Sequence, residues 1–365
     1  MERSSWLQIF ALTFLIFILS CSKTGREGAI RESTRLIDSL MENTGAVGVA
    51  VAVGIDGKLV WSEGFGYANL EMGVPVDPAT TRFRVGSVSK PFTATALGQL
   101  HEEGKLDWDT HVQKYVPDFP KKRMPVVTRL VAGHLNGIRS YRPGEFIMNY
   151  HYETVSSALE IFKNDTLMHP PGSKYLYSSY GFNLLSAVVE GASGEEFLTY
   201  MDKHVFQPLK MNHTIADHVD SIIVGRSGYY HYTSAGEVVN EIAVDNSYKW
   251  AGGGFLSTAE DLIRFGFGYL DAKILKPETI EILQTTQQTW EGEQTGYGMG
   301  WVLETDSAGR YRTGHGGGSV GGTTKFWVYP EERLVIAMIS NLSNMRVGEV
   351  PTQIVSAFLA MDEND

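Results

Sequence analysis

The strand pattern at the start of this 365-residue chain is repeated in mirror order at its end, and this feature constrains the fold most. Residues 29–44 form an amphipathic stretch with an apolar stripe at helical spacing. A β-branched run follows at 46–53 and leads through Asp56-Gly57, a type I′ hairpin signal, into the apolar residues 59–61. The start of the chain therefore predicts a helix followed by a β-hairpin.

The far end reverses this order. Strand-like runs at 323–329 and 334–339 flank a Pro-Glu-Glu-Arg turn, and an apolar helical stripe follows at 354–359. Helix–strand–strand at one end and strand–strand–helix at the other predict one antiparallel sheet built from both ends of the chain. The two terminal helices are expected to cover that sheet.

The middle of the chain, roughly residues 92–250, is richer in helical patterns. Helices are predicted at Phe92–Leu100, Val155–Phe162 and Tyr180–Glu190, and a capping box at Ser257-Thr258-Ala259-Glu260 opens one more. The predicted class is therefore α/β (α+β), with an α/β part at about 26–91 and 251–365. The mostly helical part at about 92–250 is inserted into it, with a cleft between the two parts.

Composition removes several classes of function. The net charge of −11, from 31 Lys+Arg against 42 Asp+Glu, argues against nucleic acid as a partner, because phosphate binding needs clustered cations. The single cysteine excludes an internal disulfide framework and a cysteine-rich zinc site. A hydrophobic content of 43% supports a substantial core.

That cysteine follows an apolar run typical of an export signal. Ile9–Leu19 fits a signal h-region and is too short to span a bilayer. Because Cys21 comes directly after Ser20, the segment resembles a bacterial lipoprotein signal. We expect residues 1–20 to be a signal peptide and Cys21 to be lipidated. The protein would then be exported and lipid-anchored to a bacterial membrane, on its periplasmic or extracellular face. An uncleaved membrane anchor and an ordinary thiol are the alternatives.

Two glycine patterns near the C-terminus suggest sites that their context excludes. Residues 316–321 satisfy G-x-G-x-x-G, but a strand-like run follows them where a dinucleotide site needs a helix. Residues 317–321 satisfy G-x-S-x-G, but the chain has no histidine after His315 to act as the base of an α/β-hydrolase. Neither reading is retained.

A third pattern, Ser87-Val88-Ser89-Lys90, has a context that suits catalysis. It follows a strand-like run at 82–86 and opens the predicted helix that contains Phe92–Leu100. Residues three apart share a helix face, so Lys90 can reach the Ser87 hydroxyl. A serine hydroxyl needs a neighbouring base to become a nucleophile, and a buried lysine beside other cations can lose its proton and serve as one. The alternative is a serine N-cap with a solvated lysine.

Further motifs follow in a fixed order along the chain. They are a turn at 171–179 containing Tyr177-Ser178-Ser179, and His315-Gly316-Gly317 before a strand. With Ser87-x-x-Lys90, this order resembles the serine β-lactamase and penicillin-binding family of class C type. The likeness is greatest to its serine β-lactamase-like, peptidase S12 type members, in the segments 85–93, 134–141, 171–185 and 244–265.

The resemblance implies a role for each matching residue. Ser87 is expected to be the acylating nucleophile, with Lys90 as its activating partner and Tyr177 as a phenolate that relays a proton to the leaving group. Which of Lys90 and Tyr177 takes the serine proton stays open. His315 would tune Tyr177 or contact a substrate carboxylate. The backbone N–H groups of Ser87 and Gly318 would form an oxyanion hole. The remaining substrate-binding positions are Ser179, Gly316 and Gly317, and neither a metal nor a cofactor is implied.

Two departures from the family pattern bear on the substrate. Ser179 stands where the family has an asparagine that grips a substrate amide, and His315 stands where true β-lactamases have a lysine. These changes weaken recognition of a β-lactam. The sequence therefore predicts a serine hydrolase acting on small peptides or amides, with esters possible. The alternatives are a β-lactamase or D-alanyl carboxypeptidase, and a non-catalytic or filament-forming scaffold that binds cell-wall peptides.

Overall fold

The computed structural model describes residues 5–360, with side chains from residue 25 onward. The chain forms two compact units, one of Met1–Gly45 with Arg346–Asp365 and one of Ala46–Met345. The predicted signal segment and Cys21 lie outside the residues whose side chains are described. None of the helices within the described residues combines the length and apolar character needed to cross a bilayer.

The first unit contains the two terminal helices, α1 (Ser5–Thr44) and α10 (Val350–Leu359), which pack against each other. Ile37 and Leu40 of α1 and Phe358 of α10 are buried, as their helical spacing predicts. Helices at both ends of the chain are thus confirmed.

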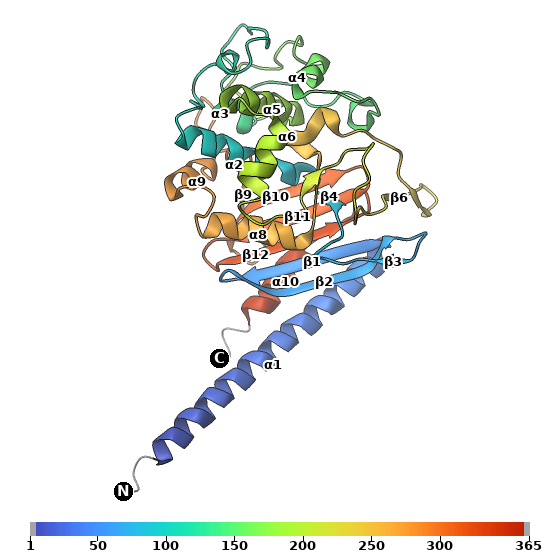
Figure 1. The fold of residues 1–365 in the computed structure, drawn as a ribbon, viewed down its shortest axis with the longest axis vertical. Helices are drawn as coiled ribbons and strands as arrows, with labels where there is room; N and C mark the ends of the chain where they lie inside the picture. The colour runs from blue at the N-terminus through green and yellow to red at the C-terminus, as the bar shows by residue number, and fades with distance from the viewer. Residues whose placement is uncertain (1–4, 361–365) are drawn as a thin grey trace. The chain divides into compact units, whose positions relative to one another are not determined.

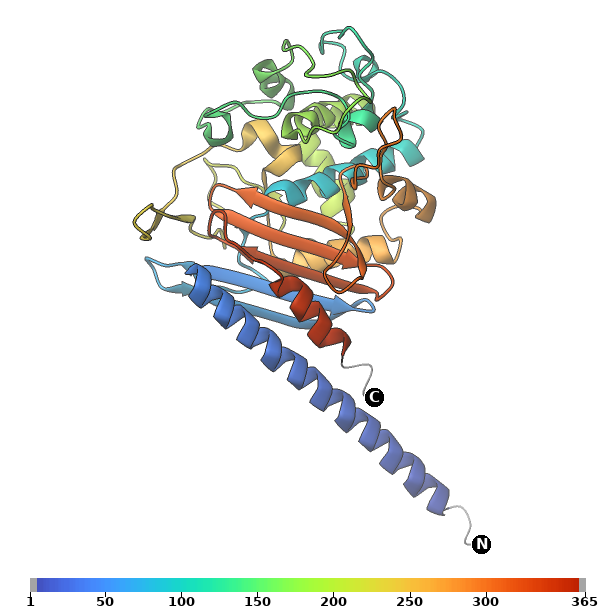
Figure 2. The same cartoon turned by 180° about the vertical axis from the view of Figure 1, so that it is seen from behind.

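The second unit contains a seven-stranded antiparallel sheet (Figures 1 and 2). In order across the sheet, its strands are β3 (Val74–Pro75), β2 (Lys58–Asn69), β1 (Gly48–Ile55), β12 (Leu334–Ser340), β11 (Gly322–Tyr329), β10 (Tyr311–Ser319) and β9 (Val302–Thr305). In the pairing of β1 with β12, Val49 lies opposite Ser340. In the pairing of β12 with β11, Ser340 lies opposite Thr323. The sheet is therefore built from both ends of the chain, as predicted.

The turn between β1 and β2 has the conformation that its sequence predicts. Asp56 has φ 48° and Gly57 has φ 76°, so both central residues are left-handed, as a type I′ turn requires. This turn fixes which residues of β1 pair with which residues of β2 in the hairpin.

The segments between the sheet strands supply most of the helices and two small sheets. The α-helices are α2 (Ser89–Glu102), α3 (Thr128–Ala132), α4 (Val155–Ala158), α5 (Ser179–Ser193), α6 (Phe197–Tyr200), α7 (Trp250–Gly253), α8 (Ala259–Leu270) and α9 (Pro277–Leu283). Shorter 3-10 turns are η1 (Gly86–Val88), η2 (Val112–Lys114), η3 (Glu145–Ile147), η4 (Leu159–Ile161) and η6 (Ser247–Lys249), and η5 (Met201–Phe206) is a π-helix. The small sheets are β4 (Phe83–Arg84), β8 (Phe255–Ser257) and β5 (Ile215–Ala216), and β6 (Tyr230–Tyr232) with β7 (Val238–Asn240).

The N-cap of α8 lies one residue after the predicted cap. Thr258 is the N-cap, and its hydroxyl accepts a hydrogen bond from the Asp261 backbone N–H. Ser257 cannot cap the helix because it is the last residue of β8, where its hydroxyl bonds Thr214. The prediction of a helix here was right, and the cap residue was wrong.

Helix α8 packs across β1, β11 and β12 of the large sheet. At the closest approach between the helix and the sheet, there is no room for a side chain on the helix. A Cβ added at Gly266 would lie 2.5 Å from a methyl carbon of Val335 in β12. Phe265 of α8 contacts both Phe326 of the sheet and Phe92 of α2. The ring centroids are 5.8 Å apart for Phe326 and 4.7 Å apart for Phe92. One continuous apolar core therefore joins the sheet to the helix that follows Ser87.

Candidate active site

Ser87 lies where a strand turns into a buried helix. Strand β4 ends at Arg84, η1 places Ser87 at its centre, and α2 begins two residues later. Lys90 is in the first turn of α2, and its Nζ lies 3.0 Å from Ser87 Oγ. The predicted three-residue spacing therefore brings the amine and the hydroxyl into hydrogen-bond contact.

The Lys90 amine is enclosed completely, with no exposed side-chain surface. Besides Ser87, its Nζ lies 2.7 Å from the backbone oxygen of Gly252 and 3.2 Å from Ser179 Oγ. Burial lowers the pKa of Lys90 well below its ordinary value, and the nearby Lys249 lowers it further. Because neither of these contacts brings a carboxylate, the neutral amine is favoured at this position.

Tyr177 is the second side chain that contacts Ser87. It directly precedes Ser178, whose hydroxyl accepts a hydrogen bond from the Gly181 N–H and caps α5. The Tyr177 phenol donates to Ser87 Oγ over 2.9 Å. Burial raises the pKa of Tyr177 above its ordinary value, although the bond to Ser87 opposes this. Burial therefore favours the phenol, whereas the family resemblance implies a phenolate.

His315 is buried on β10 and is hydrogen-bonded at both ring nitrogens. Its Nδ1 lies 2.6 Å from the Gly316 backbone oxygen, to which it can only donate, so Nε2 accepts from the Tyr297 phenol at 2.9 Å. Burial is the main cause that lowers the pKa of His315 to about 3. His315 is therefore a neutral imidazole whose Nε2 is used by Tyr297, and its ring centroid is 6.1 Å from that of Tyr177.

The glycines after His315 let β10 approach the backbone around Ser87. A Cβ at Gly317 would lie 2.0 Å from the Val85 backbone oxygen, and one at Gly86 would lie 2.6 Å from that of Gly318. Gly86 also has φ 53°, so two constraints require glycine directly before Ser87. Gly318 is exposed, with nothing within 4 Å of an added Cβ. Its backbone therefore borders open space beside the residue preceding Ser87.

Ser179 is the first residue of α5 and points into the same cluster. It is 6% exposed, and its hydroxyl contacts Lys90 Nζ and also the Tyr141 phenol. The predicted substrate-binding position thus lies against the amine of Lys90. Gly316, in contrast, is partly exposed on β10, opposite Lys325 in the register of β11.

Several residues of the site have no spacing rule that would find them. Gly252 and Lys249 lie in the 244–265 segment, His134 and Tyr141 in the 134–141 segment, and Tyr297 precedes the sheet strands. The segments 244–265 and 134–141 carried the family resemblance. Tyr297 has no comparable signal, because only the folding of β9 and β10 brings it to His315.

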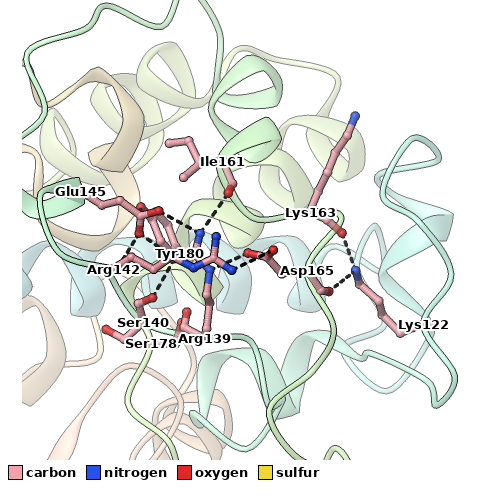
Figure 3. Close-up of polar contacts among 10 residues, drawn as sticks. All are labelled: Lys122, Arg139, Ser140, Arg142, Glu145, Ile161, Lys163, Asp165, Ser178 and Tyr180. Carbon is pink, nitrogen blue, oxygen red and sulfur yellow. Dashed lines mark hydrogen bonds and ion pairs between the residues drawn. The ribbon is translucent and has the colours of Figure 1, made fainter.

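An arginine holds the loop next to the Tyr177 turn (Figure 3). The Arg139 guanidinium bonds Glu145 in a fork, with distances of 2.6 and 3.0 Å, and Asp165 at 2.5 Å. Its remaining N–H groups donate to the backbone oxygens of Ser140 and Ile161, so all five donors are used. The Arg139 backbone oxygen in turn accepts from the Ser178 hydroxyl, the α5 cap. The loop and the cap beside Tyr177 are thereby fixed together.

The sequence and the fold of this chain are similar to those of several known proteins. The model of the family described as beta-lactamase matches residues 34–357. The mitochondrial serine beta-lactamase-like protein LACTB of Homo sapiens is 33% identical, over 90% of this chain and 80% of that protein. An octameric penicillin-binding protein homologue from Pyrococcus abyssi has a TM-score of 0.78 at 26% identity, covering 91% of this chain and 77% of its own. A D-stereospecific amidohydrolase from Streptomyces sp. shares the fold, with a TM-score of 0.72 at 24% identity over 91% and 98% of the two chains.

Proposed function

Because the chain belongs to the beta-lactamase family, whose members include serine hydrolases, we propose that it hydrolyses amide or peptide bonds through an acyl-enzyme on Ser87. One observation carries the proposal. Ser87 Oγ lies between Lys90 Nζ at 3.0 Å and the Tyr177 phenol at 2.9 Å, so one hydroxyl has a base and an acid on its two sides.

The protonation states that burial favours support Lys90 as the base. A neutral Lys90 amine donates one N–H to the Gly252 oxygen and one to Ser179, which leaves its lone pair for the Ser87 proton. Tyr177 keeps its proton because its pKa is raised. In this reading Lys90 is the general base for acylation, and Tyr177 is the acid that serves the leaving group.

The acylation step then balances. Ser87 Oγ gives its proton to Lys90 Nζ and bonds the substrate carbonyl carbon, while the carbonyl oxygen becomes an oxyanion facing the N–H groups of Ser87 and Gly318. The C–N bond breaks as Tyr177 donates its proton to the departing nitrogen. The Lys90 ammonium returns a proton to the Tyr177 oxygen. In deacylation, water bonds the acyl carbon and gives a proton to the pair formed by Lys90 and Tyr177. The bond between the acyl carbon and Ser87 Oγ then breaks, and Ser87 Oγ takes a proton from the same pair.

The neutral state of His315 supports a substrate other than a β-lactam. An imidazole with a pKa of about 3 offers no positive charge to a substrate carboxylate at neutral pH. The Streptomyces amidohydrolase of similar fold acts on amides of D-configured substrates, according to its description, which supports including D-amino-acid amides among the test substrates.

A substrate panel tests the proposal. We expect turnover of small peptide amides, and of p-nitrophenyl esters, at rates well above that of nitrocefin. A fluorophosphonate should add one label to the folded protein. Ser87→Ala should abolish labelling and lower kcat by at least about 10³-fold, and Tyr177→Phe should lower kcat by about 10²–10⁴-fold. Labelling that survives Ser87→Ala would contradict the acyl-enzyme. A folded protein that hydrolyses nothing on the panel would favour the scaffold.

We also propose that Cys21 is the lipid attachment site of an exported protein. The support is the sequence alone, an apolar run at 9–19 that ends two residues before the cysteine. Metabolic labelling in a bacterial host with an alkynyl fatty acid checks this. The wild-type chain should carry the label and sediment with membranes, and Cys21→Ala should do neither. Equal labelling of both proteins would contradict the proposal.

A further inference from the structure

His134 makes two hydrogen bonds around Tyr177, although nothing in the proposed chemistry uses it. It follows α3 and is completely buried. Its backbone oxygen accepts from the Leu176 N–H over 2.8 Å, and its ring Nδ1 accepts from the Ser178 N–H over 3.2 Å. Leu176 and Ser178 are the two chain neighbours of Tyr177. One residue thus holds the peptide groups on both sides of the Tyr177 side chain.

The imidazole ring also packs directly on the phenol ring. The ring centroids of His134 and Tyr177 are 4.3 Å apart, and those of His134 and Tyr297 are 4.6 Å apart. Tyr297 is the partner of His315. His134 therefore lies between the phenol that contacts Ser87 and the tyrosine that binds His315.

The conformation of His134 is unfavourable by itself. Its φ of 59° is left-handed, which a side chain with a Cβ adopts only where its surroundings fix it. Because Nδ1 accepts a hydrogen bond, the neutral ring carries its proton on Nε2. Among the described residues, that buried Nε2 has no hydrogen-bond partner. An apolar side chain of similar size would avoid this cost, so the benefit of a histidine here lies in the Nδ1 acceptor.

We propose that His134 is a positioning residue that holds the Tyr177 phenol against Ser87 Oγ. The inference rests on the proposed function, in which Tyr177 donates to the leaving group. His134 takes no part in proton transfer, because its ring is neutral and its Nδ1 is occupied by a backbone N–H. Burial also keeps the pKa of His134 well below its ordinary value, which favours the neutral ring.

Two substitutions separate the effect of the hydrogen-bond acceptor of His134 from the effect of its side-chain volume. Asparagine places its Oδ1 close to the position of Nδ1 and tolerates a left-handed φ, whereas leucine fills the space without an acceptor. We expect His134→Leu to lower kcat for an amide substrate by about 10–100-fold with KM changed less than about threefold. His134→Asn should recover kcat to within about fivefold of wild type. Equal losses in two folded variants would overturn the inference.

A double substitution tests whether His134 acts through Tyr177. In a Tyr177→Phe background, His134→Leu should cause less than about a twofold further loss of kcat, because the phenol to be positioned is gone. A full additive loss would overturn the inference. If His134→Leu does not fold, His134→Gln replaces it. The acceptor oxygen of glutamine lies one bond further from the backbone than that of asparagine, so we expect the same low kcat. The Ser87→Ala control separates the two proposals. If it abolishes turnover while every His134 variant matches wild type, only the His134 inference fails.

Discussion

At the scale of single residues, the site depends on keeping a lysine neutral inside protein. Lys90 is enclosed by Ser87, Ser179 and the Gly252 oxygen, and burial is the main cause of its lowered pKa. Lys249 is the second cause. It is itself buried, donates to the Phe146 backbone oxygen, and has a pKa lowered to about 7 by burial. Lys249 thus lowers the pKa of the lysine that contacts the reacting hydroxyl.

The pH profile should report this coupling. A neighbouring cation disfavours protonated Lys90, so removing it raises the pKa of Lys90 and reduces the neutral fraction at a given pH. Lys249→Met should therefore move the acid limb of kcat/KM for an uncharged ester to higher pH, by about 0.5–1 unit. Lys249→Arg, which stays charged at every pH, should leave the limb at or below its wild-type position. A limb that does not move in Lys249→Met would show that Lys249 does not influence the base.

At the scale of elements, the catalytic cluster depends on how closely β10 approaches the turn before α2. The two glycines at this contact provide a matched pair. A Cβ at Gly317 would overlap the Val85 backbone oxygen, which cannot move aside as a side chain can, whereas one at Gly318 would meet open space. Gly317→Ala should lower the free energy of unfolding by about 1–3 kcal/mol. Gly318→Ala should change it by less than about 0.5 kcal/mol. Urea denaturation measures both, and equal effects would contradict the close approach.

The loop held by Arg139 gives a second prediction at this scale. Arg139→Gln leaves the partly buried carboxylate of Glu145 without its fork partner, so we expect a loss of about 2–4 kcal/mol of stability. Arg142→Gln is the control. Arg142 also bonds Asp165, at 3.2 Å, but it is 60% exposed and its loss should cost less than about 1 kcal/mol. Thermal unfolding compares the two variants, and a smaller loss in Arg139→Gln than in Arg142→Gln would contradict the role of the cluster.

The sequence could predict local elements better than the contacts between them. The type I′ turn at Asp56-Gly57 and the Ser87–Lys90 spacing are local, and both were found. Tyr297 could not be found, because its bond to His315 depends on two strands folding beside each other. The burial of Tyr177, which favours the phenol over the phenolate that the resemblance implies, also becomes visible only in the fold. The predicted cap residue of α8 was wrong for the same reason, because Ser257 is part of β8.

At the scale of the unit formed by Ala46–Met345, the sheet and the helices around Ser87 share one core. Each half of the sheet comes from one local segment, 48–75 or 302–340, and the pairing of β1 with β12 joins the two ends of this unit at the centre of the sheet. Phe265 of α8 contacts Phe92 of α2 and Phe326 of β11. Loss of the sheet would therefore remove the packing partner of the helix that carries Lys90.

This shared core predicts that the site and the sheet unfold together. Loss of fluorophosphonate labelling at Ser87 reports the site, and the change in tryptophan fluorescence, to which the buried Trp61 and Trp327 of the sheet contribute, reports the sheet. We expect the two urea transitions to have the same midpoint, because a single core gives one cooperative transition. Gly266→Val should move both midpoints down equally, since its side chain would overlap Val335 and lift α8 from the sheet. Labelling lost at clearly lower urea than the fluorescence change would mean that the helices around Ser87 unfold independently of the sheet.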